Sequence, residues 1–553
     1  MRAPATILVF LLLLLAAPAR AAVEQPAPTD EAVGVQPEDV RLLPREDGNN
    51  GLPELLPGGP SFQPVPDASP LSPRVPQTSA LRLGAAVALR TLELPEASAV
   101  PAGHLRLPGR KNYVIPALET LIFNFGLYSL NNYVGQMEFA RVRWSDIAEH
   151  LDGRNGWTFD SDGFVVNQAG HPFQGALVHT AARSSGLSFW EGFIYTFLSS
   201  LLWELALERD PPAINDQITT TLGGVFLGEA LHRSFIYLTD DSRGPVPVVN
   251  RIAASILSPA SALNDWMLAD EMERGDVSEK ATHLGTFEIG ATVATQLSRS
   301  VGDRQTGFFY QGPQVFIGGD LEYGVPSDDQ RNYARPFSHY AVNVDAAFPR
   351  VPLLNLFIRG LLTGHRYGGP DQGVHGLLGV FGLYDMSSNH DVRVSTVGVG
   401  LGSTLRAKSL WGTEWHLTGI AGGVALGAAG SFGLSSGLEI EPGVRDYQFG
   451  PGVNGILEAS LIKPGFGKVA LRGRTWRVFG VVAPREGFEW ITYGSLEARW
   501  RVARQLAVGV DIPLMTRVHE RVQEPGIVRT SVGSNPRLVL TYSTDDVLFT
   551  RTP

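Results

Sequence analysis

The side chains best suited to chemistry lie on a run of apolar segments between about residues 110 and 272. They are acids, histidines and amides, set among residues that would otherwise form the apolar faces of helices. The set comprises Asn167, His171, His179, Glu204, Asn215, Asp216, Glu229 and His232. Three uses stay open for them: a metal site, an acid–base pair, or a buried hydrogen-bond network that holds helices together.

A metal site has weak support. Glu229 and His232 are spaced i,i+3, the half-site that di-iron carboxylate bundles use. A complete site needs a second such pair and two further glutamates on facing helices, and the sequence offers one pair. We therefore predict neither a metal nor a cofactor.

An acid–base pair would join a histidine to a carboxylate, for example His171 or His179 with Glu204 or Asp216. The two histidines are eight residues apart, so they can share one face of a helix. No Gly-x-Ser-x-Gly elbow marks a serine nucleophile, and whether the chain is an enzyme stays open.

A structural network is the remaining use. Buried carboxylates must be paired, and His171, His232 and Arg233 are natural partners for them. Gly224 and Gly228 have the small-xxx-small spacing that lets a neighbouring helix come close.

A helical domain over 110–272 would position these residues. Apolar residues recur at helical spacing in successive segments separated by Gly and Pro. The segments are Pro116–Val134, Asn167–Ser184, Ser188–Glu208, Ile214–Thr239 and Arg251–Asp270. Ser188 and Glu191 have the spacing of a capping box. The segment 186–208 is apolar enough to test as a membrane span, but it contains two glutamates, so a buried core helix is favoured over a membrane-embedded one.

Stretches of alternating apolar and polar residues fill the chain from about residue 280 to 545. Thr286–Leu297, Tyr340–Phe348 and Leu506–Leu514 are typical. A strand turns its side chains alternately to two faces, and about 9–11 tilted residues cross a bilayer. The fold class we predict is α+β: an N-terminal helical domain followed by an antiparallel transmembrane β-barrel of about 12 strands. A soluble β-sandwich is the alternative, because each of its sheets also has one apolar and one solvated face.

Charged residues alternate with apolar ones in two of these strands. They are Arg472, Arg474, Glu497 and Arg499. A charge facing lipid at mid-depth costs about 2–4 kcal/mol, so we expect these four side chains to line the barrel lumen. There they would form a structural ion-pair network or, alternatively, a polar track or catalytic cluster.

The first part of the chain predicts export. Residues 1–21 have the charged start, apolar core and small-x-small end of a cleavable signal peptide. Residues 22–109 are rich in Pro and polar residues, which predicts a disordered segment. The chain has no cysteine, so disulfides and a lipoprotein anchor are excluded. The net charge of −10, with no Lys/Arg-rich block, gives no sign of nucleic-acid binding.

The runs "WTFDSDGFVVNQAGHPFQG", "PPAINDQITTTLGGVFLGEALHR" and "ILSPASALND" resemble the uncharacterised bacterial family known as domain of unknown function 3943. The resemblance covers roughly residues 110–270. It implies an exported protein of a Gram-negative bacterium with a barrel-like C-terminal portion, and no assigned reaction. The positions that carry the resemblance are Asn167, His171, Pro172, Gly175, Trp203, Glu204, Asn215, Asp216, Gly228, Glu229 and His232.

The functional prediction is an outer-membrane barrel whose helical domain, periplasmic or inside the lumen, plugs, gates or caps it, in transport or binding of a small or lipidic molecule. The alternative is an envelope enzyme, a lipid or cell-wall hydrolase or a metal-dependent enzyme, that uses the acids and histidines of the helical domain. The expected partners are outer-membrane lipid and the barrel-assembly machinery.

Overall fold

The computed structural model describes residues 111–543, apart from gaps at 155, 240–244, 269–282, 302–303, 307–308, 327–332, 334, 349–352, 370–371, 390–391, 410, 431–446, 482–486, 504 and 522–525. The predicted signal peptide (1–21) and disordered segment (22–109) lie outside these residues.

The described part of the helical domain consists of α-helices, several of which run directly into a short π-helical turn. The α-helices are α3 (Val114–Ser129), α4 (Trp144–Leu151), α5 (His171–Ser184), α6 (Phe189–Leu202), α7 (Ile214–Ile218), α8 (Gly224–Thr239), α9 (Val248–Leu257) and α10 (Pro259–Met267). The π-helical turns are η1 (Leu130–Val134), η2 (Val166–Gly170), η3 (Trp203–Leu207) and η4 (Thr219–Gly223). Within the described residues, no helix is both long enough and apolar enough to cross a membrane.

Local sequence signals explain where these helices begin. The Ser188 hydroxyl accepts a hydrogen bond from the Glu191 backbone N–H, and the Glu191 carboxylate accepts one from the Ser188 backbone N–H, as the capping-box spacing predicts. The next helix begins at Ile214, after Ala213 in an extended conformation and without a side-chain cap. Asn215 and Asp216 therefore lie inside the first turn.

Helices α5 and α8 form the centre of the domain and touch through glycine. A Cβ added at Gly175 would lie 1.9 Å from the Thr220 carbonyl oxygen, and one at Gly224 would lie 2.6 Å from the Gly175 Cα. A Cβ at Gly228 would lie 2.9 Å from the His179 Cβ. The helix backbones can approach this closely only because these positions carry no side chain.

The strands form a single antiparallel sheet. They are β1 (His283–Val301), β2 (Arg304–Thr306), β3 (Phe309–Tyr323), β4 (Tyr340–Phe348), β5 (Leu353–Gly369), β6 (Val374–Ser388), β7 (Arg393–Lys408), β8 (Glu414–Gly430), β9 (Tyr447–Lys463), β10 (Gly467–Gly480), β11 (Gly487–Ala503), β12 (Leu506–Arg521), β13 (Arg529–Ser534) and β14 (Arg537–Ser543).

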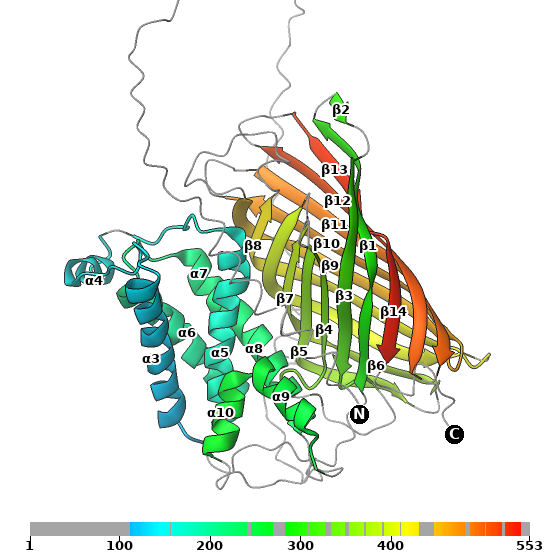
Figure 1. The fold of residues 1–553 in the computed structure, drawn as a ribbon, viewed down its shortest axis with the longest axis horizontal. Coiled ribbons are helices and arrows are strands. Elements are labelled where there is room, and N and C mark those ends of the chain that lie inside the picture. Colours follow the sequence, from blue (N-terminus) through cyan, green and yellow to red (C-terminus); the bar gives the residue numbers. More distant parts are fainter. Residues whose placement is uncertain are drawn as a thin grey trace, which may run out of the picture. The chain divides into compact units, whose positions relative to one another are not determined.

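The sheet closes on itself, which confirms the predicted barrel of 12 strands (Figure 1). β1 pairs with β3 on one side and with β13 and β14 on the other, and β11 pairs with β12. β13 and β14 pair with successive parts of the same two neighbours, so together they occupy one position in the ring. β2 is a short extension paired only with β1. Closure satisfies the backbone groups that an open sheet would leave at its edges.

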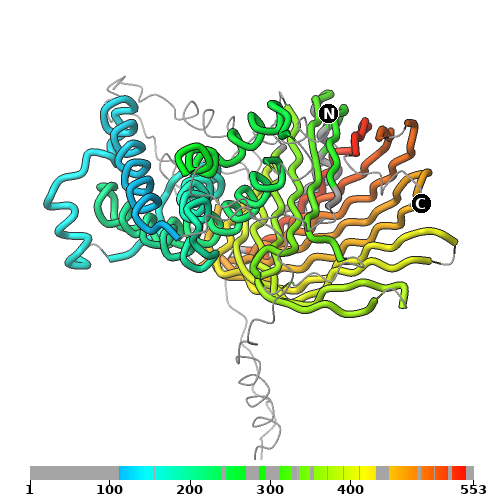
Figure 2. Tube along the Cα trace, turned by 90° about the horizontal axis from the view of Figure 1, so that it is seen from below, coloured from blue at the N-terminus to red at the C-terminus, as the bar shows by residue number. Residues whose placement is uncertain are grey.

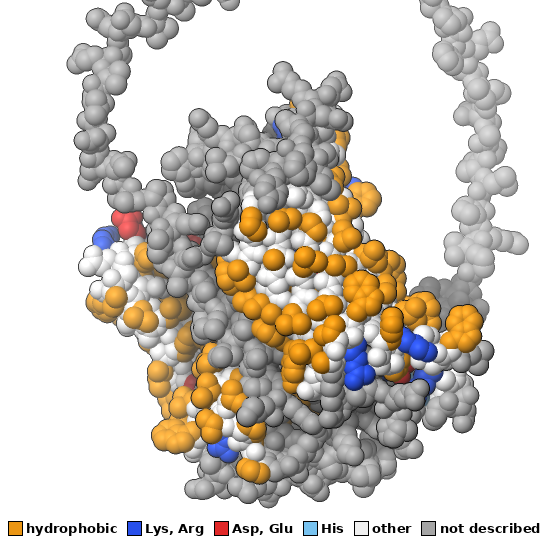
Figure 3. All heavy atoms as spheres, turned by 45° about the vertical axis from the view of Figure 1, so that its right-hand side comes forward, with side chains coloured by type: hydrophobic (Ala, Val, Ile, Leu, Met, Phe, Trp, Pro, Cys, Tyr) orange, Lys and Arg blue, Asp and Glu red, His pale blue; other side chains and the backbone are white. Residues whose placement is uncertain are grey.

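Alternation along the strands separates a polar inner face from an apolar outer face. In β4, Asn343 and Asp345 bond to charged side chains of the interior, while Val342 and Val344 point outward. On the outer face of other strands, Leu401 and Leu457 are 65% and 66% exposed. Hydrophobic side chains spread over the barrel wall with few charges among them (Figure 3).

The helical domain packs against the outside of this wall. Outward-pointing residues of β4–β9 share one hydrophobic core with Phe189, Val225, Phe226 and Phe235 of the helices. We call these strand residues the docking face; they are Tyr340, Val342, Val344, Leu356, Ile358, Tyr384, Met386, Val397, Leu426, Tyr447 and Phe449. The helices lie beside the ring of strands in two perpendicular views (Figures 1 and 2).

This packing corrects one expectation. A helical plug inside the lumen is wrong for the described residues, because the helices bury outward-pointing strand residues and the two interior cavities are lined by residues of the strands alone. The inner face is too rich in charged side chains to accept apolar helices.

Candidate functional site

The polar residues singled out in the helical domain form two separate clusters. His179 and Glu229 belong to one, between α5 and α8. Asn167, His171, Glu204, Asn215 and Asp216 belong to the other, where η2, η3 and α7 meet. His171 and His179 do lie on the same side of α5, but two turns separate them and each serves a different cluster.

The first cluster surrounds Glu229, which is completely buried. Its carboxylate accepts hydrogen bonds from Arg183 Nε at 2.6 Å and from Arg233 Nε at 2.8 Å, and it contacts His179 Nε2 at 3.1 Å. Burial favours the neutral acid, but Arg183 and Arg233 hold the pKa of Glu229 well below its usual range. We call His179, Arg183, Glu229 and Arg233 the Glu229 cluster.

The Glu229 cluster joins the helices to each other and to the barrel. Arg183 donates to the Leu187 carbonyl at the end of α5. Arg233 donates to the Pro336 carbonyl at 2.6 Å, in the connection between β3 and β4. Both oxygens of the Glu229 carboxylate are hydrogen-bonded, so the cluster offers no vacant ligand position. Its geometry is that of a structural ion-pair network that holds the helices together.

His232 does not join Glu229 in a common site. Its Nδ1 lies 3.2 Å from the Ser261 hydroxyl of α10, whereas Glu229 faces the two arginines. Among the described residues, no group of three or more His, Cys, Asp or Glu side chains is arranged to hold a metal ion.

The second cluster is rich in acids. Asp160 Oδ1 accepts from Asn167 Nδ2 at 2.6 Å and from Asn215 Nδ2 at 2.7 Å, and Asn215 also donates to Asp216. Glu204 accepts from the Ala213 backbone N–H at 2.7 Å. The barrel takes part through Tyr447, whose hydroxyl donates to the Asp162 carbonyl. We call Asp160, Asp162, Glu204, Glu208 and Asp216 the carboxylate cluster.

These acids hold protons more tightly than free carboxyl groups do. Burial, together with the neighbouring carboxylates, raises the pKa of Glu204 to about 8 and that of Asp162 to about 6. The same causes raise the pKa of Asp216 well above its usual value. His171 lies 3.5 Å from Asp216, yet burial lowers its own pKa, so it supplies little positive charge. The cluster can therefore take up and release protons near neutral pH.

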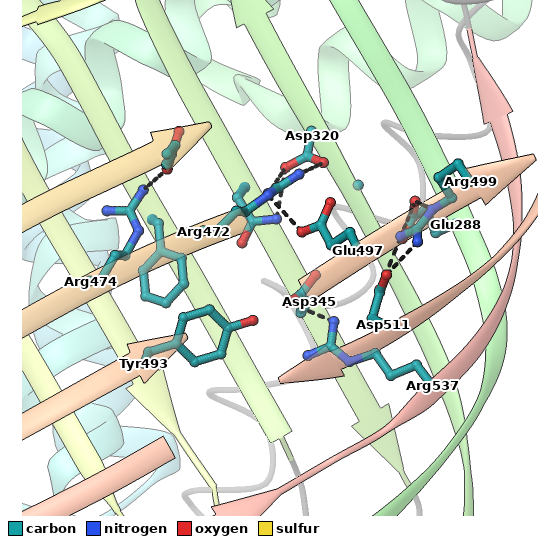
Figure 4. A pocket seen from close by; sticks show the side chains of 14 residues that line it. Glu288, Asp320, Asp345, Arg472, Arg474, Tyr493, Glu497, Arg499, Asp511 and Arg537 are labelled. Carbon is teal, nitrogen blue, oxygen red and sulfur yellow. Dashed lines mark hydrogen bonds and ion pairs between the residues drawn. The ribbon is translucent and has the colours of Figure 1, made fainter. Parts of the chain in front are cut away.

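The lumen holds a third set of polar residues, which includes all four predicted charges (Figure 4). Arg472 binds Asp320 through both terminal nitrogens at 2.7 Å and Glu497 through Nε at 2.6 Å. Arg499 binds Glu288 through two nitrogens at 2.8 Å and also binds Asp511. Bidentate Arg–carboxylate pairs are among the strongest charge-assisted hydrogen bonds.

Several of these pairs reach across the barrel. Arg472 on β10 meets Asp320 on β3, although four strands separate the two by the shorter way around the ring. Arg474 binds Asp385 at 2.8 Å and Glu458 at 3.1 Å, and its guanidinium lies 4.4 Å from the centre of the Phe357 ring. We call the whole set the ion-pair belt; it comprises Glu288, Asp320, Asp345, Arg359, Asp385, Glu458, Lys468, Arg472, Arg474, Glu497, Arg499, Asp511 and Arg537.

Little space remains beside the belt. One cavity of about 20 Å³ lies among Asp320, Arg472, Arg499 and Arg537, and another of about 110 Å³ lies among Arg359, Arg406, His416 and Lys468. Such cavities have room for a few water molecules. Barrels of about 8 strands are filled by their side chains and those of 16 or more leave a channel, so this barrel of intermediate size is filled at the level of the belt.

Sequence reasoning missed many partners in these sites. Arg183 is a lone cation in an apolar helix, Asp160 and Asp162 lie in a loop, and Tyr447 begins a strand far along the chain. For the belt, alternation itself was an available signal, since Asp320, Asp345 and Asp511 occupy the polar phase of their strands as Arg472 does.

Comparison with protein families gives one match. Residues 156–260 match the family model described as "Domain of unknown function (DUF3943)", which confirms the resemblance for that part of the chain. The match covers the Glu229 cluster and the carboxylate cluster. Among curated proteins, no relative matches the chain.

Solved structures give matches to outer-membrane barrels. The outer membrane protease OmpT from Escherichia coli is 9% identical, with 48% of this chain and 97% of that chain covered and a TM-score of 0.17. A TodX monoaromatic hydrocarbon channel is 10% identical, with 49% and 92% covered and a TM-score of 0.20. OpdQ from Pseudomonas aeruginosa is 7% identical, with 47% and 97% covered and a TM-score of 0.17.

Proposed function

We propose that this protein is an outer-membrane barrel whose lumen is kept closed by its ion-pair belt and passes small charged or polar solutes when the belt rearranges. The helical domain acts as a gate from the side: it packs against β4–β9, which carry Asp345, Arg359, Asp385 and Glu458 of the belt. This differs from a plug, because nothing has to leave the lumen for the passage to open.

The membrane location is supported by the two faces of the wall. Charges fill the inner face, whereas the outer face carries exposed residues such as Leu401, Leu457, Leu471 and Leu496. In water this outer surface would be a large unsatisfied apolar area, and in a bilayer it is the expected band. The long strands, of which β8, β9 and β11 each have 17 residues, exceed what a tilted crossing needs.

Neighbouring residues of the same strands carry the gating proposal. In β6, Tyr384 points outward and donates to the Gln168 carbonyl of the helical domain, while Asp385 points inward and binds Arg474 and Trp476. In β5, Ile358 lies in the docking face and Arg359 binds Glu458. A shift of the helices is thereby passed through the wall to the belt within one residue.

The lumen part of the proposal is tested by single-channel conductance of the full chain in planar bilayers. Wild type is expected to show low, infrequent conductance. Arg472→Ala removes the guanidinium that joins Asp320 to Glu497, and is expected to raise unitary conductance several-fold. Arg477→Ala is the matched control, because Arg477 lies on the outer face of the same strand, over the Phe479 ring. Conductance unchanged by Arg472→Ala would contradict a path through the lumen.

The gating part needs variants that loosen docking and leave the belt intact. The double variant Tyr384→Phe, Tyr447→Phe removes hydroxyls that bond to the helical domain and is expected to increase the open probability without changing unitary conductance. Tyr542→Phe is the control, since its hydroxyl bonds within the barrel, to Gln505. An open probability that is the same in the double variant and in Tyr542→Phe would contradict gating by the helical domain.

A further inference from the structure

Two helices of the helical domain, α3 and α6, have their polarity reversed relative to the helices of a water-soluble bundle. In α3, the buried residues are Pro116, Thr120 and Asn124, while Ile122 is 72% exposed. In α6, Gly192, Thr196, Ser199 and Ser200 are buried with Phe189, while Ile194 is 54% exposed. Exposed apolar residues are common singly, but a helix that hides its hydroxyls and shows its aliphatic side chains is not.

The exposed residues of these helices form a stripe at helical spacing. We call it the outward apolar face; it consists of Leu118, Leu121, Ile122 and Phe125 of α3 and Trp190, Ile194, Phe197 and Leu198 of α6. The two helices are neighbours: Tyr195 donates to the Tyr113 carbonyl, and Asn124 donates to the Ser199 hydroxyl at 2.7 Å. The stripes therefore belong to one surface and not to two unrelated faces.

The interior of the domain is built as helices are joined in lipid. Backbones touch through Gly175 and Gly224, and amides and hydroxyls bond between helices, as when Gln174 donates to Asn124 and Asn124 to Ser199. Small residues and polar side chains are what hold helices together where the surroundings are as apolar as the side chains.

The outward apolar face resembles the outer surface of the barrel wall, because both expose apolar side chains. The helical domain occupies part of the outer surface of β4–β9, and exposed residues of those same strands, Val399, Leu401, Val453 and Leu457, lie beyond the docking face. In the space-filling view, hydrophobic side chains occupy both the barrel wall and the helices (Figure 3).

We infer that α3 and α6 lie against the acyl-chain layer beside the barrel, with their outward apolar face in contact with lipid tails. The occupant of this face is thus the bilayer and not a second copy of the chain or a soluble partner. Contact of this kind needs one apolar face and does not require a helix that crosses the membrane alone. The inference rests on the membrane location proposed above.

The chain has no cysteine, so single cysteines can report this surface directly. Spin-labelled Ile122→Cys and Ile194→Cys variants of the full chain, refolded into phosphatidylcholine vesicles, are compared by power saturation with oxygen and with a water-soluble nickel chelate. Leu457→Cys is the lipid control on the barrel and Arg154→Cys the water control, because the Arg154 side chain is 68% exposed. We expect both helix positions to match Leu457→Cys, with high oxygen and low nickel accessibility.

Each other outcome is decisive. Nickel access at Ile122→Cys and Ile194→Cys with exclusion at Leu457→Cys overturns the inference and leaves the barrel in the membrane. Nickel access at all three overturns the membrane location as well. Spectral broadening at the helix positions that disappears on dilution with unlabelled protein assigns the face to a second copy and overturns the inference.

Discussion

At the residue scale, Glu229 decides whether the centre of the helical domain is stable. Arg183 and Arg233 are both buried and both face this carboxylate. Glu229→Gln leaves two buried cations without a counter-charge, so we expect a loss of about 3–5 kcal/mol in the free energy of unfolding of the helical domain. Denaturant unfolding followed by hydrogen exchange of the α5 and α8 amides measures it.

The control for that change is an exposed pair. Arg154 and Asp152 lie 2.7 Å apart with both side chains more than half exposed. Asp152→Asn is expected to change stability by about 0–1 kcal/mol. An equal effect of Glu229→Gln and Asp152→Asn would show that Glu229 does not hold the helices together.

The carboxylate cluster predicts a pH dependence with a defined sign. Because burial raises the pKa of Glu204 from its usual 4.5 to about 8, the folded state binds this proton more tightly than the unfolded state does. Its contribution to stability is complete below about pH 4.5 and is lost as the pH rises to 8. The protection factors of the η3 and α7 amides, which are corrected for the intrinsic rise of exchange with pH, are expected to fall across this range.

Glu204→Gln separates the cause from a general effect of pH. A glutamine has no proton to lose, so hydrogen exchange in η3 and α7 is expected to vary less with pH than in wild type. A pH profile identical to that of wild type would place the titration on other acids of the cluster.

At the element scale, the contact between α5 and α8 depends on the absence of side chains. A Cβ at Gly175 would overlap the Thr220 carbonyl, which is backbone and cannot turn away. We expect Gly175→Ala to destabilise the helical domain by about 1–3 kcal/mol, the usual cost of overpacking. Thermal unfolding followed by circular dichroism measures the change.

Gly126→Ala is the matched control in the same domain. Gly126 lies inside α3, and a Cβ added there would have nothing within 4 Å. The alanine gains about 0.5–1 kcal/mol of helix propensity, so a small stabilisation is expected. Destabilisation by both substitutions would mean that close approach is not what Gly175 provides.

The elements themselves were readable from the sequence, while their contacts were not. Alternation predicted the strands because each one has a polar and an apolar face. A β-sandwich shares this pattern, so the closed ring of 12 is what the structure adds. The capping box at Ser188 placed the start of α6. Side-chain periodicity does not show what lies against an apolar face, however, so it did not predict that the outer faces of β4–β9 pack in part against helices.

The same limit explains the polar residues. Arg472 and Arg499 were placed in the lumen by the cost of charge in lipid, yet each has one partner, Asp320 or Glu288, on a strand more than 100 residues away in the chain. For α6, the apolar composition favoured a buried helix, but hydrophobic residues are exposed there and Thr196, Ser199 and Ser200 are buried. Composition does not show which side of a helix faces the interior. The close approach of helices through glycine decides which side that is.

At the scale of the whole molecule, contact with lipid reverses the effect on stability that is expected of a charged substitution on the outward apolar face. Ile122→Asp and Ile194→Asp would be neutral or mildly stabilising if those side chains met water. In lipid, we expect each to cost up to about 2.5–3.5 kcal/mol, depending on its depth. Urea unfolding of the full chain in vesicles distinguishes the two, with Leu457→Asp as the comparison on the barrel. A cost confined to Leu457→Asp would contradict lipid contact by the helices.

The docking face also sets an order of events during biogenesis. The described helices precede every described strand in the chain, so they are synthesised before the wall they pack against exists. Until β4–β9 are paired, Phe189 and Phe226 lack their partners on the strands. The barrel, in turn, closes only when β14 meets β1. The nascent chain therefore carries apolar surface without its partner across the whole interval between those two moments, and aggregation is expected to be greatest there.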